Sequence, residues 1–356
     1  MHPASASPQG TQTLRKRFAS LERNQFYRVA QGLTMSSLGI GTYLGPMDDD
    51  TDRAYSSAVR TAIRQGINVV DTSLNYRHQR SERSVGRAIE AVIQSGDSAR
   101  NELVVSTKAG YLVPKAIPTA GLEPGDIVAN MHCLKPAFLK DQLERSLLNL
   151  RLQRVDIFYL HNPETQLQFL EPREVYRRIG EAFDACEAMV AAGKISYYGV
   201  ATWDGFRRRP GGADGLQLSR LAVLAKQAGG AQHHFRFVQL PFNLAMPEAI
   251  SVRNQGDDPN ACVPVLEAAH GLGISVIGSA TLMQGRLTKD LPEKFVEKFT
   301  ESLPTQAQRA IQFARSTPGI TTSLIGMSKA SRVAENMAVG KVMPFSEAEY
   351  YSFYGR

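Results

Sequence analysis

The chain has 356 residues, 43% of them hydrophobic, and a formal net charge of +7 at neutral pH. This length fits two ordinary domains or one large α/β barrel, and the hydrophobic fraction is sufficient for a full core. No apolar run approaches the roughly 20 residues of a membrane-spanning helix, so we expect no membrane partner. Residues 1–30 account for +4 of the charge, and the remaining +3 argues against a nucleic-acid-binding protein.

The N-terminal segment is polar, and it lacks the apolar middle of a secretory signal. We therefore expect residues 1–15 to be a flexible tail and residues 16–356 to form a single domain. The three cysteines are widely spaced and odd in number, which predicts reduced thiols and a cytoplasmic protein. No Cys/His metal spacing occurs, and the pair His233–His234 alone does not indicate a metal site.

Strand-like and helix-like segments alternate along the chain. Eight short runs rich in Val and Ile are predicted as strands: 37–43, 67–73, 103–109, 155–161, 195–202, 235–242, 274–281 and 320–327. Helical patterns lie between them, at 54–65, 82–93, 136–150 and 174–194. In the third of these helices Pro136 fits the first turn, and leucines then recur at spacings of three and four.

Eight strand-helix units predict an α/β fold of the (β/α)8 TIM-barrel type. The alternative is a doubly wound open sheet, which would place a Gly-rich phosphate fingerprint after the first strand. The sequence GIGTYLGP after that strand does not match the fingerprint. Long loops follow the third, fifth, sixth and seventh predicted strands, at 111–135, 205–215, 244–260 and 286–304. In a barrel, loops that follow strands border the catalytic face.

Polar side chains occur at the ends of three successive predicted strands. Asp71 ends the second strand and Tyr76 follows in its loop, Lys108 ends the third strand, and His161 ends the fourth. One charged residue at a strand end is often only a cap. Three neighbouring strands with such ends indicate a catalytic rim.

This set fits proton transfer to a carbonyl oxygen. A free phenol has a pKa of roughly 10, and an adjacent ammonium favours the phenolate. We therefore predict that Lys108 lowers the pKa of Tyr76, that Asp71 is the counter-ion of Lys108, and that His161 orients the carbonyl. Tyr76 would be the general acid.

The stretches DTSLNY (71–76), STKAG (106–110) and YLHNPE (159–164) carry this tetrad, and with them the sequence resembles the aldo-keto reductases over roughly residues 32–340. The resemblance implies a barrel enzyme that reduces an aldehyde or ketone to an alcohol by direct hydride transfer from NADP(H). Family members use NADPH and sometimes NADH, and the reaction is reversible. Asp71, Tyr76, Lys108 and His161 match the family's tetrad residue by residue.

The resemblance also implies cofactor-binding residues. Gly41, Thr42 and Tyr43 match the first strand, and Gln239 matches the glutamine that holds the nicotinamide carboxamide. The segment 282–287 resembles the loop over the pyrophosphate, and 325–337 resembles the segment around the 2′-phosphate and adenine. From these two segments come Leu282, Gln284, Gly285, Arg286, Ser328, Lys329, Arg332, Glu335 and Asn336. A basic helix start near residue 331 favours NADPH over NADH.

Three positions depart from the family pattern. The common Ser-Asn pair after the fifth strand is Ala201-Thr202 here, and one hydroxyl cannot replace a side-chain amide. Ser279 stands where an aromatic ring often stacks on the nicotinamide, and Gly326 where some members have a phosphate-binding lysine. These departures bear on cofactor affinity and on the preference for NADPH.

Two alternatives remain open in the sequence: a sugar or alcohol dehydrogenase that uses the same site, and a low-turnover NADPH-binding regulatory subunit. The predicted partner is a small carbonyl or alcohol substrate, and the sequence does not set the oligomeric state. Candidates for the substrate space are Arg77, His78, Tyr111, His132, Cys133 and Trp203. For His132 and Cys133 a packing role in the loop is the alternative.

Overall fold

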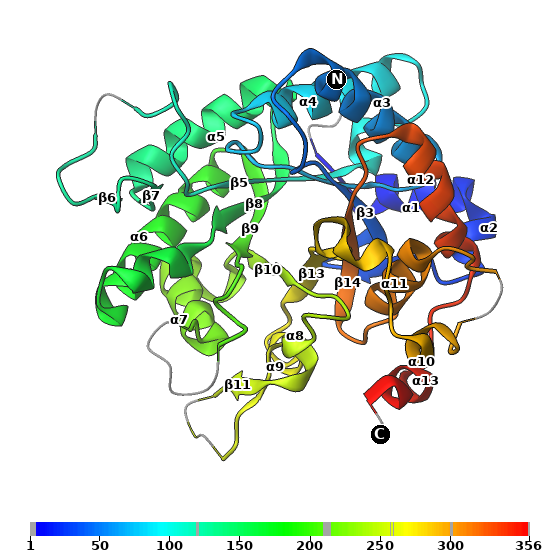
Figure 1. The fold of residues 1–356 in the computed structure, drawn as a ribbon. Helices are drawn as coiled ribbons and strands as arrows, with labels where there is room; N and C mark the ends of the chain where they lie inside the picture. Colours follow the sequence, from blue (N-terminus) through cyan, green and yellow to red (C-terminus); the bar gives the residue numbers. More distant parts are fainter. Residues whose placement is uncertain are drawn as a thin grey trace.

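The computed structural model describes residues 5–118, 121–208, 215–256, 258, 260–299 and 302–354. Eight parallel strands close into a barrel in the order β10-β13-β14-β3-β4-β5-β8-β9 (Figure 1). Their bounds are β3 Leu38–Gly41, β4 Val69–Asp71, β5 Val104–Ala109, β8 Val155–His161, β9 Ile195–Ala201, β10 Phe235–Pro241, β13 Ser275–Ser279 and β14 Ile320–Gly326. Each strand lies within one of the eight predicted runs, so the predicted (β/α)8 fold is confirmed.

Helices surround the barrel between successive strands (Figure 1). They are α3 Asp49–Arg64, α4 Arg80–Gln94, α5 Pro136–Leu150, α6 Pro172–Ala191, α7 Leu218–Gly229, α9 Val265–Gly271, α11 Gln306–Arg315 and α12 Ala330–Asn336. Helix α5 begins at Pro136 as predicted, and the leucine stripe at 139, 143, 147 and 150 is buried. Within the described residues, no helix is long and apolar enough to cross a membrane.

The N-terminal segment differs from the predicted tail. Residues Pro8–Arg17 form helix α1, followed by α2 Ala19–Glu22. The Ser7 hydroxyl accepts the Gly10 N–H at 3.0 Å, Pro8 occupies the first turn, and Leu14 is fully buried. A serine cap followed by proline is a helix start signal, so a flexible tail over residues 1–15 was the wrong prediction for residues 8–15. Residues 1–4 lie outside the described residues.

An antiparallel hairpin precedes the first barrel strand, formed by β1 Tyr27–Ala30 and β2 Leu33–Ser36. Leu33 and Met35 pack in one buried cluster with Val69 and Val104, the residues that begin β4 and β5. The hairpin therefore closes the end of the barrel at which the strands begin. The opposite end, where the strands finish, is left for the loops that carry polar side chains.

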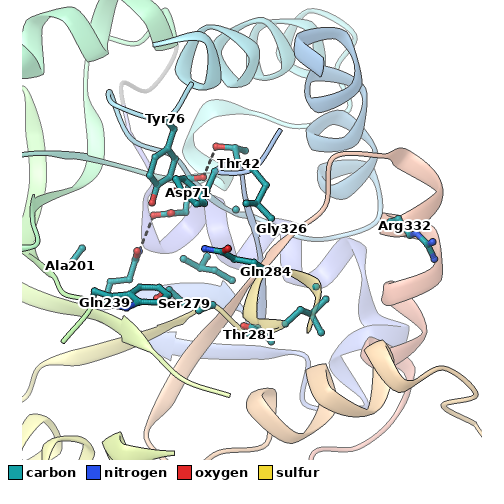
Figure 2. A pocket seen from close by; sticks show the side chains of 18 of the residues that line it. Thr42, Asp71, Tyr76, Ala201, Gln239, Ser279, Thr281, Gln284, Gly326 and Arg332 are labelled. Carbon is teal, nitrogen blue, oxygen red and sulfur yellow. Dashed lines mark hydrogen bonds between the residues drawn. The ribbon is translucent and has the colours of Figure 1, made fainter. Parts of the chain in front are cut away.

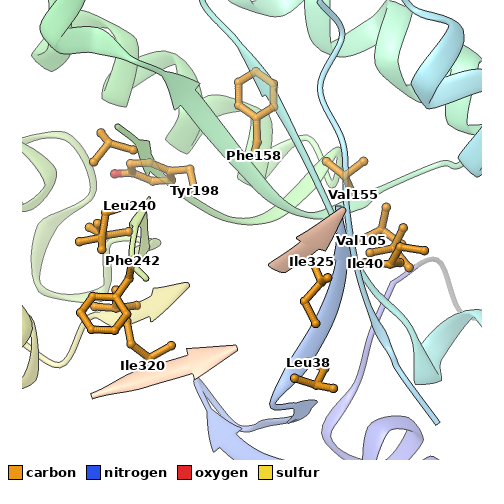
Figure 3. Close-up of a cluster of buried hydrophobic side chains, with 14 of the residues drawn as sticks. Leu38, Ile40, Val105, Val155, Phe158, Tyr198, Leu240, Phe242, Ile320 and Ile325 are labelled. Carbon is orange, nitrogen blue, oxygen red and sulfur yellow. The ribbon is translucent and has the colours of Figure 1, made fainter. Parts of the chain in front are cut away.

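The core has two layers, as expected for a barrel within a ring of helices. In β3, Leu38 and Ile40 belong to the outer layer between strands and helices, part of which Figure 3 shows. Gly39, between them, faces the barrel interior, where an added Cβ would lie 2.7 Å from a Leu324 side-chain carbon. A glycine at this position therefore allows the interior to pack closely.

The long loops contain short elements that the sequence did not indicate. Residues 111–135 include β6 Ile127–Val128 paired with β7 His132–Cys133, and the sixth loop includes α8 Glu248–Ser251 and β11 Arg253–Gln255, which pairs with β12 Val263–Pro264. The remaining short elements are η1 Arg100–Glu102, η2 Pro163–Gln168, η3 Gly230–Gln232, η4 Met283–Thr288, α10 Glu293–Val296, η5 Met337–Lys341, α13 Glu347–Tyr351 and η6 Ser352–Tyr354. Residues 209–214 of the predicted fifth loop lie outside the described residues.

Candidate active site

Sheet register brings the predicted tetrad together. Asp71 pairs in register with Ser106 of β5, and Lys108, two residues further on, lies on the same face. The Lys108 ammonium donates to Asp71 Oδ2 at 2.6 Å and to the Thr72 carbonyl at 2.8 Å. Both side chains are almost completely buried. Asp71 is therefore the counter-ion of Lys108, as the strand-end pattern predicts.

Two further donors hold the Asp71 carboxylate. Ser106 Oγ and Gln239 Nε2 both donate to Oδ1, at 2.7 and 2.9 Å. Figure 2 shows Asp71 between the Tyr76 ring and Gln239. Because a buried charge is stable only when it is paired and hydrogen-bonded, these contacts fix the carboxylate in one orientation. Burial lowers the pKa of Lys108, and the Asp71 carboxylate opposes that shift.

Tyr76 lies among the rings and charges of the rim. Its ring centroid is 4.9 Å from that of Tyr43, 5.8 Å from that of His161 and 4.9 Å from Lys108 Nζ. Burial, and then the Asp71 charge, raise the pKa of the phenol well above its ordinary value. A lowered pKa of Tyr76 was the wrong prediction for the net shift, because desolvation and the Asp71 charge dominate. The phenol therefore keeps its proton at neutral pH, as a general acid must.

His161 is neutral in this environment. Burial lowers its pKa well below the ordinary value, and the Lys108 and His132 side chains act in the same direction. Its Nδ1 lies 3.2 Å from Ser73 Oγ. The Ser73 hydroxyl also donates to Asn75 Oδ1 at 2.6 Å, so it must turn toward the ring before it can donate to Nδ1. In that arrangement Nε2 carries the ring proton and can donate to a substrate oxygen.

His132 and Cys133 take the packing role that was their alternative. His132 Nε2 lies 2.7 Å from the His161 carbonyl oxygen, which can only accept, so Nε2 carries the proton. Its Nδ1 then accepts from Gln166 Nε2 at 3.1 Å, and burial lowers the pKa of His132 to about 4. Burial raises the pKa of the Cys133 thiol to about 11. Neither residue lines the substrate space.

A cavity of about 850 Å³ opens beside the tetrad. It extends from Ala201 and Gln239 at one end to Arg332 at the other, as Figure 2 shows. The predicted site residues that line it are Gly41, Thr42, Tyr43, Asp71, Tyr76, His161, Thr202, Gln239, Ser279, Leu282, Gln284, Gly285, Gly326, Arg332, Glu335 and Asn336. Tyr111 and Trp203 also line it, in agreement with their candidate role in substrate binding.

Other predicted residues lie outside the cavity wall. Lys108 is behind Asp71, and Arg286, Ser328 and Lys329 do not line the cavity. Arg77 and His78 do not line it either. The sequence alone does not show which of these basic residues faces the cavity, as Arg332 does, because the direction of a side chain at a helix start depends on the local fold.

Some lining residues were missed in the sequence. Thr305 caps helix α11 through a capping box with Gln308, and both Thr305 and Ala307 line the cavity. The pattern T-x-x-Q before an apolar stripe could have indicated this helix start. Asn162, directly after the predicted fourth strand, and Thr281, the last residue of the predicted seventh strand, also line it.

The cavity wall contains polar atoms that lack a protein partner. Thr202 Oγ1, Thr281 Oγ1 and Asn336 Oδ1 are buried and have no hydrogen-bond partner among the described residues. Buried polar groups are normally hydrogen-bonded, so these atoms indicate an elongated polar ligand in the cavity. These atoms are spread along the cavity, which reaches from Ala201 to Arg332, as a dinucleotide with polar groups along its length requires.

A second, smaller cavity of about 280 Å³ adjoins the first, and we call it the side chamber. Tyr111, Asn162 and Trp203 line both cavities. Beyond them the side chamber is lined by Glu164, Thr165, Gln168, Asp204 and Arg208. Every lining side chain carries a hydrogen-bonding group, so the chamber is suited to a polar part of a substrate.

Comparison with known proteins agrees with this geometry. The sequence model of the Aldo/keto reductase family matches residues 37–353. Similar solved structures include an aldo/keto reductase from Klebsiella pneumoniae in complex with NADP and acetate (18% identity, 93% of this chain and 95% of that chain, TM-score 0.61). Another is the holo form of an aldo-keto reductase from Bacillus halodurans (20% identity, 92% of this chain and 95% of that chain, TM-score 0.61). A third is a glycerol dehydrogenase from Gluconobacter oxydans (20% identity, 93% of this chain and 94% of that chain, TM-score 0.62). The chain belongs to the aldo/keto reductase family.

Proposed function

We propose that this protein reduces an aldehyde or ketone to an alcohol with NADPH, and that Tyr76 gives the proton to the carbonyl oxygen. The observation that carries the proposal is the position of Tyr76, Asp71 and His161 in one end of a long cavity whose other end contains Arg332. Structural neighbours that contain NADP or NADPH support the choice of cofactor.

NADPH, when bound, supplies the hydride for the carbonyl carbon. Tyr76 donates its proton to the oxygen, and neutral His161 holds that oxygen through Nε2–H. Lys108 and Asp71 form an ion pair beside the phenol, and their mutual contact fixes both charges in position. The protonated phenol is the form that donates to the carbonyl oxygen in reduction, and the reverse reaction would start from its deprotonated form.

The residues of the cavity wall support an orientation of the cofactor with the nicotinamide near Gln239 and the adenine near Asn336. Gln239 donates to Asp71 through Nε2, which leaves its Oε1 free to accept from the carboxamide of the nicotinamide. Thr202 Oγ1, without a protein partner among the described residues, is a second group for that carboxamide. At the other end, Arg332 would hold the 2′-phosphate, and Asn336 Oδ1 would bind the adenine.

Replacing Arg332 by alanine is expected to weaken NADPH binding by about tenfold and NADH binding by less than about twofold. The reason is that the guanidinium donates to a phosphate that only NADPH carries. Arg332 now pairs with Glu335 at 2.6 Å, and its side chain is 65% exposed, so it is free to turn toward a ligand. Titration of cofactor fluorescence measures both constants.

The control for this experiment is Arg53→Ala, because Arg53 is an arginine of similar exposure on α3 whose ion pair is with Asp50. It should leave both constants unchanged. Equal losses of NADPH and NADH affinity in Arg332→Ala would contradict a 2′-phosphate site at this helix.

From the polar lining of the side chamber we expect a preference for substrates with hydroxyl groups. In the chamber wall, Asp204 forms ion pairs with Arg207 and Arg208, so a neutral polar group fits better than a charged one. Replacing Thr165 by valine should lower kcat/KM for a hydroxylated four-carbon aldehyde by about threefold to tenfold and leave that for butanal unchanged. Steady-state kinetics with both aldehydes tests this, and an equal change for both would exclude the chamber from substrate binding.

The proposed function itself is tested by NADPH consumption with a panel of aldehydes and ketones. Turnover of at least one carbonyl compound is expected. Turnover only of alcohols with NADP⁺ would favour the dehydrogenase alternative, and tight NADPH binding with no turnover in either direction would favour a regulatory subunit.

A further inference from the structure

The backbone directly after Tyr76 adopts an unusual conformation. Arg77, His78 and Gln79 have positive φ angles of 48°, 48° and 72°. Residues with a Cβ rarely adopt this left-handed region, and three in succession are rarer still. The surroundings of the loop must therefore stabilise this conformation, and the same loop carries the proposed acid.

The Arg77 side chain supplies a fixed point for this loop. Its guanidinium is only 2% exposed and donates to Asp52 Oδ1 at 2.7 Å. It also lies 4.8 Å from the ring centroid of Tyr55 and 3.4 Å from Ser84 Oγ. Asp52 and Tyr55 belong to α3, and Ser84 belongs to α4. Arg77 therefore joins the loop to two helices of the outer ring.

Tyr76 and Arg77 are consecutive residues of the loop, but their side chains lie on different sides of it. Tyr76 lines the cavity beside Tyr43 and His161, whereas Arg77 is buried against α3 outside the cavity wall. Because Arg77 directly follows Tyr76 and consecutive Cα atoms are a fixed distance apart, a shift of the Arg77 backbone also displaces the backbone of Tyr76. Arg77 was a candidate substrate residue in the sequence, and its burial excludes that role.

We propose that Arg77 and Asp52 are positioning residues of the acid: their buried ion pair holds the left-handed loop and thereby fixes the Tyr76 hydroxyl relative to His161. Asp52 is especially suited to this because it also pairs with Arg80 at 2.9 Å and with Arg87 at 3.6 Å. Three arginines, one just before α4, one at its start and one in its middle, thus share one carboxylate on α3. The proposal rests on the assignment of Tyr76 as the acid.

The experiment compares Arg77→Ala, Arg77→Gly and Asp52→Asn with the wild type and with the control Arg53→Ala. Alanine removes the ion pair and keeps the cost of positive φ, whereas glycine removes the ion pair and also that cost. For each variant kcat is expressed per NADPH-binding site, so that any unfolded fraction does not count. NADPH dissociation constants and thermal midpoints are measured on the same samples.

We expect Arg77→Ala and Asp52→Asn to lower kcat by about tenfold or more, because displacement of a catalytic group by about 1 Å has effects of this order. NADPH affinity should change by less than about twofold, since neither residue lines the cavity. Arg77→Gly should retain more activity than Arg77→Ala.

Two results would overturn the proposal. One is kcat within about twofold of wild type in both Arg77→Ala and Asp52→Asn. The other is a loss of kcat that is accompanied by an equal loss of NADPH affinity and is as large in Arg77→Gly as in Arg77→Ala. This result would mean that the ion pair supports the barrel as a whole. Failure of the underlying assignment is distinguishable, because Tyr76→Phe would retain turnover if another group were the acid. Failure of the proposed function is distinguishable too, because the wild type itself would then turn over no carbonyl compound.

Discussion

Replacing Tyr76 by phenylalanine should lower kcat by about 10²- to 10⁴-fold, the range that a general acid contributes. The substitution removes the hydroxyl and keeps the ring, whose contacts with Tyr43 and His161 hold this side of the cavity together. NADPH affinity and the thermal midpoint should stay close to wild type. The measurements are steady-state kinetics with a reactive aldehyde and fluorescence titration of the cofactor.

Tyr197→Phe is the matched control, since it makes the same chemical change at a tyrosine whose hydroxyl donates to the Gln31 carbonyl, between the barrel and the hairpin. It should retain nearly full activity. If Tyr76→Phe kept more than about a tenth of wild-type kcat, another group would be the proton donor.

Replacing Lys108 by methionine should destabilise the protein by about 3–5 kcal/mol, because it leaves the buried Asp71 carboxylate without its counter-ion. Turnover should also be lost, because the charge pair beside the phenol is gone. Chemical denaturation measures the free energy of unfolding, and the aldehyde assay measures turnover.

The double variant Asp71→Asn/Lys108→Met separates these two effects. An asparagine oxygen can still accept from Ser106 and Gln239, and no unpaired charge remains. We expect the double variant to recover most of the lost stability but none of the lost turnover. Single variants with unchanged stability, or an active double variant, would contradict the role of the pair.

The parts of the site that could be predicted from the sequence depend on strand ends. Asp71, Lys108 and His161 each finish an apolar run, and parallel strands in a closed barrel finish at the same rim. Their meeting therefore follows from the alternation of strands and helices. The contact between Gln239 and Asp71 follows less directly, because their strands are on different sides of the barrel order.

Other features depend on tertiary contacts that leave little trace in the sequence. Helix α1 has ten residues and would be marginal alone, so its stability comes from burial of Leu14 and from its cap. The sign of the Tyr76 pKa shift depends on how far burial outweighs nearby charges. The positive φ angles after Tyr76 are unexpected for arginine, histidine and glutamine. Tertiary contacts hold them, among them the ion pair of Arg77 with Asp52 and the backbone hydrogen bond from Gln79 N–H to the Leu74 carbonyl.

In the proposed reaction a carbonyl compound is reduced by hydride from NADPH and a proton from the protein. It is tested most directly by incubating the purified chain with NADPH that carries two deuterium atoms at C4 of the nicotinamide and with a panel of aldehydes and ketones. Mass spectrometry of the product should find an alcohol with one deuterium on the former carbonyl carbon. Alcohol without deuterium, or no alcohol from any aldehyde or ketone of the panel, would contradict the proposed function.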